Sequence, residues 1–379
     1  MDRPFVGEFE DALLLGRIQT ADGPSPVLVR NGRLFDLSGE VATTADLLAG
    51  CEPGETLPQG KDMGLLSEQD WAPVWSGGAA GLLSPIDLQC IKAAGVTFAV
   101  SAVERVIEER ARGDAGKAND IREIIRERVG AELAHVRPGS EQAETLKGLL
   151  MDQGLWSQYL EVAIGPYAEV FTKSPILSSV GWGAQVGVRS DSHWNNPEPE
   201  IVVVCDPKGR IRGVTLGNDV NLRDIEGRSA LLLGKAKDNN ASCAIGPFIR
   251  LFDGRYGLDQ VRQTTVELEI VGRDNFRLEG SSSMSLISRD PVDLAAQVIS
   301  PDHQYPDGFV LFLGTMFAPI EDRDHPGHGF THKVGDIVRV SAPGLGVLVN
   351  QVVHCDEAPP WTFGVSAFMR NLAARGMLA

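Results

Sequence analysis

The stretch Asn196-Pro197-Glu198-Pro199-Glu200 leads directly into an apolar run, Ile201 to Cys205. In an extended segment, residues two apart point to the same face, so Glu198 and Glu200 project together. A proline cannot donate a hydrogen bond to a sheet, so the two prolines place this segment at an edge or rim of a sheet. The pattern predicts a strand that presents two carboxylates where a ligand can approach.

A hairpin follows this strand. Asp206-Pro207-Lys208-Gly209 has the preferences of a type I turn, and residues 211–216 provide the returning strand. With Asp206 opposite Gly209, Glu198 faces Gly217, and Asp219 lies diagonally across from Glu198, about 7–8 Å away. Three converging carboxylates repel one another unless a hard cation such as Mg²⁺ lies between them. The alternative is a solvated acidic edge, and a one-residue bulge would separate the three side chains.

Length and charge limit the kinds of partner. The 379 residues suffice for two domains or for one large domain with an appendage. A net charge of −16 argues against nucleic acid or an anionic membrane as a partner, and it favours a small-molecule substrate held by a local cation. The sequence has no signal peptide or apolar run of membrane-spanning length, and its five scattered cysteines are typical of reduced thiols. We therefore expect a cytoplasmic protein.

The chain is expected to divide near residue 80. Residues 1–80 are expected to form a small N-terminal α+β domain, with a hairpin turn at Asn31-Gly32. Residues 81–379 are expected to form a β-rich catalytic domain with a helical lid or insertion near 98–156. Helices are predicted at 98–112, 118–135, 141–156, 292–299 and 368–378, and strands at 13–20, 27–30, 33–37, 264–271, 336–340 and 346–353.

Two further groups of residues have both a functional and a structural interpretation. Lys237 lies at the predicted end of a helix that begins near Arg228, where a lysine often only complements the helix dipole, although it can also act as a general base. His325, His328 and His332 have the spacing of zinc ligands, but the intervening proline and glycines favour an exposed loop without a metal.

The order of several motifs resembles the fumarylacetoacetate hydrolase family over residues 82–379. These motifs are Phe171-Thr172-Lys173, Glu198-Pro199-Glu200, Gly217-Asn218-Asp219-Val220, Arg223-Asp224, Lys237, Ile245-Gly246-Pro247 and Gly314-Thr315. The resemblance implies an α+β, β-rich fold with a rolled mixed β-sheet. It implies Mg²⁺ or Mn²⁺ on Glu198, Glu200 and Asp219, and a catalytic role for Lys237. Among the other matching positions, it implies substrate binding by Thr315, Lys173, Arg223 and Asn239.

The departures from the family pattern point to one branch. Hydrolases of the family carry a histidine and a glutamate three residues apart on a helix near Gly95, and the matching positions here are Ser101 and Glu104. The water-activating histidine is therefore missing. The run from Ser190 to Glu200 and the Asn239-Asn240 pair resemble the sugar-acid branch, which includes bacterial 2-keto-3-deoxy-D-pentonate (xylonate or arabinonate) dehydratases of oxidative pentose breakdown.

This resemblance implies a metal-dependent hydro-lyase that converts a 2-keto-3-deoxy sugar acid into 2,5-dioxopentanoate and water. Lys237 is the expected base for the C3 proton, and Glu104 or, one helical turn on, Glu108 is the expected acid for the C4 hydroxyl. Relatives form dimers or tetramers, so a homodimer or homotetramer is expected. Two alternatives stay open: a C–C bond hydrolase for acylpyruvates that uses the same metal site, and a non-catalytic ligand-binding member of the fold.

Overall fold

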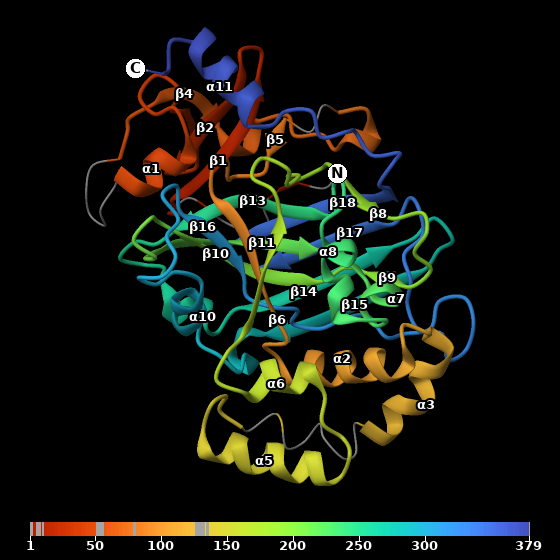
Figure 1. Cartoon of the computed structure of the whole chain (residues 1–379). Coiled ribbons are helices and arrows are strands. Elements are labelled where there is room, and N and C mark those ends of the chain that lie inside the picture. The colour runs from red at the N-terminus through yellow and green to blue at the C-terminus, as the bar shows by residue number, and fades with distance from the viewer. Residues whose placement is uncertain are drawn as a thin grey trace.

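A computed structural model describes residues 3–4, 9, 11–50, 57–78, 81–125, 133 and 136–378, without the side chains of 120 and 123–125. Strands form the middle of the molecule (Figure 1). Four labelled helices, α2, α3, α5 and α6, gather at one end, and the first strands lie with the C-terminal helix α11 at the opposite end.

The largest sheet has eleven strands in the order β4-β3-β2-β1-β13-β11-β10-β16-β6-β7, with β5 paired to β1 beside this path. Its strands are β1 (Leu14–Thr20), β2 (Gly23–Arg30), β3 (Arg33–Asp36), β4 (Lys61–Leu65), β5 (Leu82–Leu83), β6 (Cys90–Gly95), β7 (Glu169–Ser174), β10 (Pro199–Cys205), β11 (Ile211–Asp219), β13 (Cys243–Leu251) and β16 (Phe309–Phe312). Pairing is antiparallel except between β16 and β6, so the sheet is mixed.

A second sheet of five strands has the order β15-β14-β17-β18-β8, and a two-stranded sheet pairs β12 with β9. These strands are β8 (Gln185–Val188), β9 (Asn195–Asn196), β12 (Asn221–Leu222), β14 (Thr265–Val271), β15 (Arg277–Ser283), β17 (Ile337–Ala342) and β18 (Gly346–His354). The predicted alternation at 264–271 is confirmed, because Val266, Leu268 and Ile270 are all buried.

Strand β10 lies in the interior of the fold, and all seven of its residues are buried. Ile201 and Val203 belong to one apolar core, while Val202 and Val204 belong to another on the opposite face. Successive side chains of a strand alternate between faces, so an unbroken apolar run is what a strand covered on both sides requires. The strand-rich mixed architecture confirms the expected fold class, and it holds the carboxylates that precede and follow this run on a rigid support.

The helical insertion comprises α2 (Ala99–Ala111), α3 (Ala115–Ile125), α5 (Glu141–Asp152) and α6 (Gln158–Ile164). The helices predicted at 98–112 and 141–156 are confirmed in type, and much of 126–135 in the third falls outside the described residues. Helix α6 was not predicted, and it is capped by the preceding Ser157, whose hydroxyl accepts from the backbone N–H of Tyr159. The insertion has an apolar core of its own, which includes Val106, Ile107 and Leu160.

The N-terminal strands extend the large sheet, because β1 pairs with β13 at Leu14 and Leu15. The turn at Asn31-Gly32 is confirmed by positive φ angles of 50° and 68° between β2 and β3. The division of the chain at residues 80 and 81 stays a prediction, since a continuous sheet neither requires nor forbids separate domains.

The remaining helices lie between the strands or after the last of them. They are α1 (Thr44–Gly50), α7 (Arg223–Glu226), α8 (Leu233–Lys237), α9 (Leu258–Val261), α10 (Pro291–Val298) and α11 (Val365–Ala374), with short 3₁₀ turns η1 (Leu66–Glu68), η2 (Val74–Ser76), η4 (Ala230–Leu232) and η5 (Met284–Leu286). Among the described residues, none of the helices has both the length and the apolar character needed to cross a bilayer.

Candidate metal centre

The hairpin of β10 and β11 forms as predicted but in a different register. Glu200 pairs with Gly217 and Pro199 with Asn218, and the register shifts between Val204 and Cys205. The predicted register is therefore wrong by two residues, because the irregularity next to the turn adds residues that turn preferences alone do not reveal. Asp219 lies directly across from Glu198, with its N–H donating to the Glu198 carbonyl at 3.0 Å. A shift of two keeps the same face, so the carboxylates still converge.

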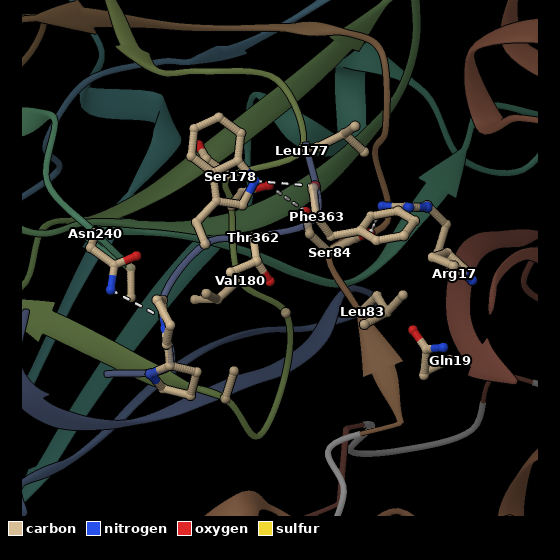
Figure 2. A pocket seen from close by; sticks show the side chains of 18 of the residues that line it. Arg17, Gln19, Leu83, Ser84, Leu177, Ser178, Val180, Asn240, Thr362 and Phe363 are labelled. Atoms are coloured by element: carbon tan, nitrogen blue, oxygen red, sulfur yellow. Dashed lines mark hydrogen bonds between the residues drawn. The ribbon is translucent and has the colours of Figure 1, made fainter. Parts of the chain in front are cut away.

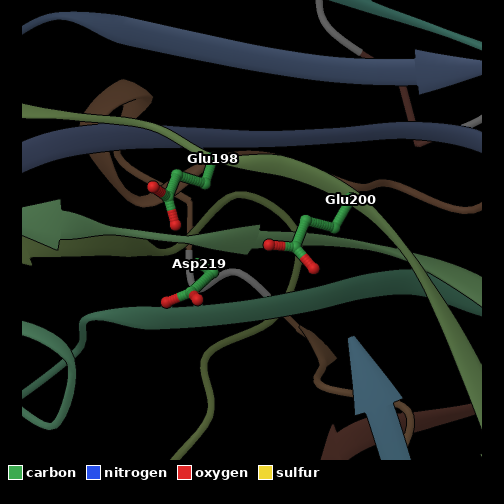
Figure 3. A group of neighbouring side chains, drawn as sticks. All are labelled: Glu198, Glu200 and Asp219. Atoms are coloured by element: carbon green, nitrogen blue, oxygen red, sulfur yellow. The ribbon is translucent and has the colours of Figure 1, made fainter. Parts of the chain in front are cut away.

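Glu198, Glu200 and Asp219 form a carboxylate cluster at this end of the hairpin. Each can offer one oxygen so that all three lie within 4.8 Å of one another. Figure 3 shows the three side chains pointing toward a common space from neighbouring strands. All are buried, with at most 2% of their surface exposed. The prediction that these carboxylates share one point in space agrees with this geometry, and their role as metal ligands stays a prediction.

Glu200 provides a test of whether the cluster suits a cation. Its carboxylate accepts from the Gly314 N–H at 2.7 Å and from the Thr315 hydroxyl at 3.3 Å. Among the described residues, no lysine, arginine or histidine forms an ion pair with it. Burial, reinforced by the charges of Asp219 and Glu198, raises the pKa of Glu200 well above its ordinary value. A buried carboxyl group without a positive partner fits a divalent oxygen-seeking ion such as Mg²⁺.

Two lysines supply positive charge to the cluster. Lys237, at the end of α8, donates to Glu198 and lies 3.0 Å from Asp219 Oδ2, and Lys173 lies 2.8 Å from Asp219 Oδ1. Burial acts to lower the pKa of Lys237, but Asp219, Glu198 and Glu226 outweigh it and raise the pKa above its ordinary value. The ammonium of Lys237 also lies 5.9 Å from the centre of the Phe171 ring. The lysine therefore lies inside the cluster and does more than complement a helix dipole.

Glu104 and Glu108 occupy the inner face of α2, where arginines engage both oxygens of each carboxylate. Arg122 donates to both oxygens of Glu104 at 2.9–3.3 Å. Glu108 accepts from Arg105 on one oxygen and from Arg223 on the other, at 2.6 Å each. Arginines thus occupy both oxygens of each predicted acid, and the role of either residue as the acid stays a prediction. Arg223, predicted to bind substrate, also donates to the Pro319 carbonyl at 3.1 Å and lies within the protein.

Sequence reasoning missed two other carboxyl groups near the cluster. Glu169 on β7 lies on the same face as Phe171, two residues on, and burial raises its pKa. Its carboxylate lies against Gly95, where an added Cβ would come within 2.1 Å of an Oε2 atom. Burial raises the pKa of Glu226 on α7 to about 7. The sequence feature that could have identified Glu169 is its position two residues before Phe171, because Phe171 begins the Phe171-Thr172-Lys173 motif.

Thr315 and Asn239, two predicted substrate-binding residues, occupy different surroundings. The Thr315 hydroxyl contacts Glu200, so it lies at the cluster. Asn239 donates from Nδ2 to the Lys235 carbonyl and lines a cavity of about 460 Å³ with Cys355 and Trp361. Its neighbour Asn240 donates to the carbonyls of Cys355 and Pro359. These two hydrogen bonds anchor the segment around Pro359, which borders a second cavity of about 370 Å³ (Figure 2).

The three histidines of the loop differ in exposure, and His325 and His328 are exposed as expected. His325 and His328 stack edge to face with ring centres 5.6 Å apart, and in the described part of the chain only Glu198, Glu200 and Asp219 form a group of potential metal ligands. His332 is buried, so the expectation of an exposed loop is wrong for this residue. Its Nδ1 lies 3.3 Å from Asp336, which also pairs with Arg323.

Comparison with known proteins places the chain in a family. A family model described as fumarylacetoacetate (FAA) hydrolase C-terminal matches residues 166–353. A 2-dehydro-3-deoxy-D-arabinonate dehydratase of Saccharolobus solfataricus is 31% identical over 227 residues, which cover 59% of this chain and 69% of that protein. The chain belongs to the fumarylacetoacetate hydrolase family. A probable 2-keto-3-deoxyxylonate dehydratase of Haloferax volcanii is 30% identical over 213 residues, or 56% of this chain and 68% of that protein.

Solved structures of a dehydratase share the fold of this chain. A crystal form of 2-keto-3-deoxyarabinonate dehydratase superposes with a TM-score of 0.63 at 23% identity, covering 89% of this chain and 98% of the other. A 2-keto-3-deoxy-D-arabinonate dehydratase complexed with magnesium and 2,5-dioxopentanoate gives a TM-score of 0.62 at 23% identity, covering 90% and 99%. The family assignment made from the motifs is confirmed.

Replacing Glu200 tests whether the cluster is built for a cation. In the presence of a chelator at neutral pH, Glu200→Gln should raise the free energy of unfolding by about 1–3 kcal/mol, because a neutral amide avoids the cost of burying this carboxylate or of keeping it protonated. An unfolded glutamate releases its proton near pH 4.5, whereas the folded Glu200 holds it to higher pH. The unchanged protein should therefore lose stability relative to the variant as pH rises above about 4.5. Urea denaturation at several pH values measures this difference.

Excess Mg²⁺ should reverse the order of stability, since the ligand stabilises only a protein that binds it. A variant that is less stable than the unchanged protein without a metal at neutral pH would contradict the prediction.

Proposed function

We propose that this protein catalyses the metal-dependent dehydration of 2-dehydro-3-deoxy-D-pentonate to 2,5-dioxopentanoate and water. The observation that carries the proposal is the buried carboxylate cluster, with Lys237 inside it, in a chain that resembles two named dehydratases over more than half its length. Ser101 supports a lyase over a hydrolase, because its hydroxyl donates to the Phe98 carbonyl on α2 where family hydrolases carry a histidine.

The reaction removes a proton from C3 and the hydroxyl group from C4, which leaves a double bond between them. Tautomerisation then converts the C5 alcohol into an aldehyde: C5 loses one proton from carbon and one from its hydroxyl oxygen, and C3 and C4 each gain one. A divalent cation on the carboxylate cluster supplies two effects: it offsets the carboxylate charge and polarises the keto oxygen of a 2-keto acid, which acidifies the C3 protons. A smaller negative charge around Lys237 would weaken its hold on the proton, and this lysine would then act as the base for the C3 proton.

We propose Glu169 as the proton donor to the leaving C4 hydroxyl. Among the described residues, no side chain forms an ion pair or hydrogen bond with its carboxyl group, in contrast to Glu104 and Glu108. Burial keeps its pKa raised, so a larger share of the group is protonated near neutral pH. Glu104 and Glu108 then hold Arg122, Arg223 and Arg105 in place. Thr315 is the proposed contact for the substrate carboxylate.

One assay tests the function. Purified protein is incubated with Mg²⁺ and each C4 epimer of 2-dehydro-3-deoxypentonate, and the aldehyde is trapped and quantified. At least one epimer should give 2,5-dioxopentanoate, and a chelator should abolish the reaction. Efficient cleavage of an acylpyruvate without turnover of either epimer would contradict the proposal and favour a C–C hydrolase.

Simultaneous replacement of His325, His328 and His332 by alanine should leave Mg²⁺ binding at the cluster intact.

We also propose that the protein acts as a homodimer or homotetramer in the cytoplasm. The four described cysteines, Cys90, Cys205, Cys243 and Cys355, are all free thiols, which supports a reducing compartment. Light scattering coupled to gel filtration measures the assembly, and a monomer across the micromolar range would contradict it.

A further inference from the structure

Arg105 on α2 joins the helical insertion to the carboxylate cluster. Its Nη2 donates to Glu198 Oε1 at 2.5 Å, a contact between residues 93 positions apart. Its Nη1 lies 2.6 Å from Glu108 on the same helix and 2.9 Å from Glu226 on α7. The side chain is only 10% exposed. One buried guanidinium therefore connects α2, α7 and a residue of the cluster.

This contact is the inner end of a longer series of alternating charges. Glu108 also binds Arg223, whose Nη2 lies 3.3 Å from Glu104, and Glu104 pairs with Arg122 of α3. Positive and negative side chains thus follow one another from the cluster to the second helix of the insertion. Charges this close and this well buried are weakly screened, so a change at one end alters the attraction along the series.

We propose that Arg105 is a positioning residue through which docking of α2 and occupation of the carboxylate cluster by a divalent cation oppose each other. The proposal rests on the cation site of the proposed function. Arg105 and a cation are both attracted to Glu198 and repel one another, so the cation weakens the contact that holds α2. An anionic substrate brings negative charge to the cluster and restores the attraction. Coupling of this kind is reciprocal: if the cation loosens α2, loss of the arginine tightens binding of the cation.

Two measurements on four proteins test the coupling. The proteins are the unchanged chain, Arg105→Gln, Arg105→Lys and the control Arg110→Gln, which alters an exposed arginine of α2 that donates to the Gly154 carbonyl. Calorimetric titration gives the affinity for Mg²⁺, and hydrogen–deuterium exchange of residues 99–111 with and without Mg²⁺ reports the docking of α2. Neither readout depends on turnover.

Arg105→Gln should bind Mg²⁺ at least about 5-fold more tightly than the unchanged protein, which is the lower end of usual coupling strengths. Arg105→Lys keeps the charge, so its affinity should lie closer to that of the unchanged protein. Mg²⁺ should accelerate exchange in α2 of the unchanged protein and of Arg110→Gln, but not of Arg105→Gln, where the contact is already lost.

If Arg105 has only a structural role, the opposite effects on Mg²⁺ affinity and on exchange in α2 are expected. Weaker or equal Mg²⁺ affinity in Arg105→Gln, or protection of α2 by Mg²⁺ in the unchanged protein, would overturn the proposal. If Arg105→Gln does not fold, Arg105→Lys decides the matter. A lysine cannot hold three carboxylates as a guanidinium fork does. Mg²⁺ should therefore accelerate exchange in α2 of Arg105→Lys less than in the unchanged protein, and an equal acceleration would contradict the proposal. Normal dehydration without coupling overturns this inference alone, whereas an unchanged protein that takes up no Mg²⁺ overturns the proposed function as well.

Discussion

Lys237→Met should slow exchange of the substrate C3 protons with solvent by about 10²–10⁴-fold, the usual contribution of a positioned base. Methionine keeps an unbranched stem but has no amine, so it can neither accept nor donate the proton. Dehydration should fall by at least the same factor, because removal of the C3 proton precedes loss of the hydroxyl group. Proton NMR in deuterated water, with Mg²⁺ and 2-dehydro-3-deoxypentonate, follows both processes in one sample.

The affinity of Lys237→Met for Mg²⁺ distinguishes loss of the base from loss of the site. Lys237 contacts Glu198 and Asp219, so removing its charge takes away a competitor of the cation, and the affinity should not fall. Lys235→Met is the matched control, since Lys235 is two residues earlier, half exposed and 3.2 Å from Asp191. Normal C3 exchange in Lys237→Met would assign the base to another group.

Glu169→Gln should separate the two halves of the reaction. The C3 protons should still exchange, because Lys237 is intact, while dehydration should fall by about 10²–10⁴-fold for want of an acid. Gly95→Ala offers a second test, because the added Cβ displaces the Glu169 carboxylate without removing it. Dehydration should fall in this variant too, by a smaller factor.

Glu104→Gln is the comparison that decides between the two acids. Glu104 pairs with Arg122 of α3 and with Arg223, so Glu104→Gln should weaken the packing of α3 against α2 and lower the melting temperature. Turnover should fall less than in Glu169→Gln. If Glu104→Gln instead exchanges C3 protons without forming product, and Glu169→Gln dehydrates normally, Glu104 is the donor. Glu108→Gln is the next variant to examine if neither has this effect.

The sequence determined the features that depend on neighbouring residues. Residues two apart in a strand share a face, so spacing alone is enough to place Glu198 and Glu200 together. Asn31-Gly32 specified its turn because both residues accept positive φ angles, which most residues avoid. The apolar spacing and charged content of α2 predicted its type and nearly its bounds, since helix periodicity is a local property.

Only the tertiary structure decided which distant side chains meet. The irregularity between Val204 and Cys205 sets Asp219 directly opposite Glu198, and turn preferences carry no record of it. Docking of the insertion brought Arg105 to Glu198 and occupied the oxygens of Glu104 and Glu108, while the pairing of β6 with β7 laid Glu169 against Gly95. These contacts join residues far apart in the chain, so they depend on how whole elements pack. Local spacing fixes only the direction in which each side chain points.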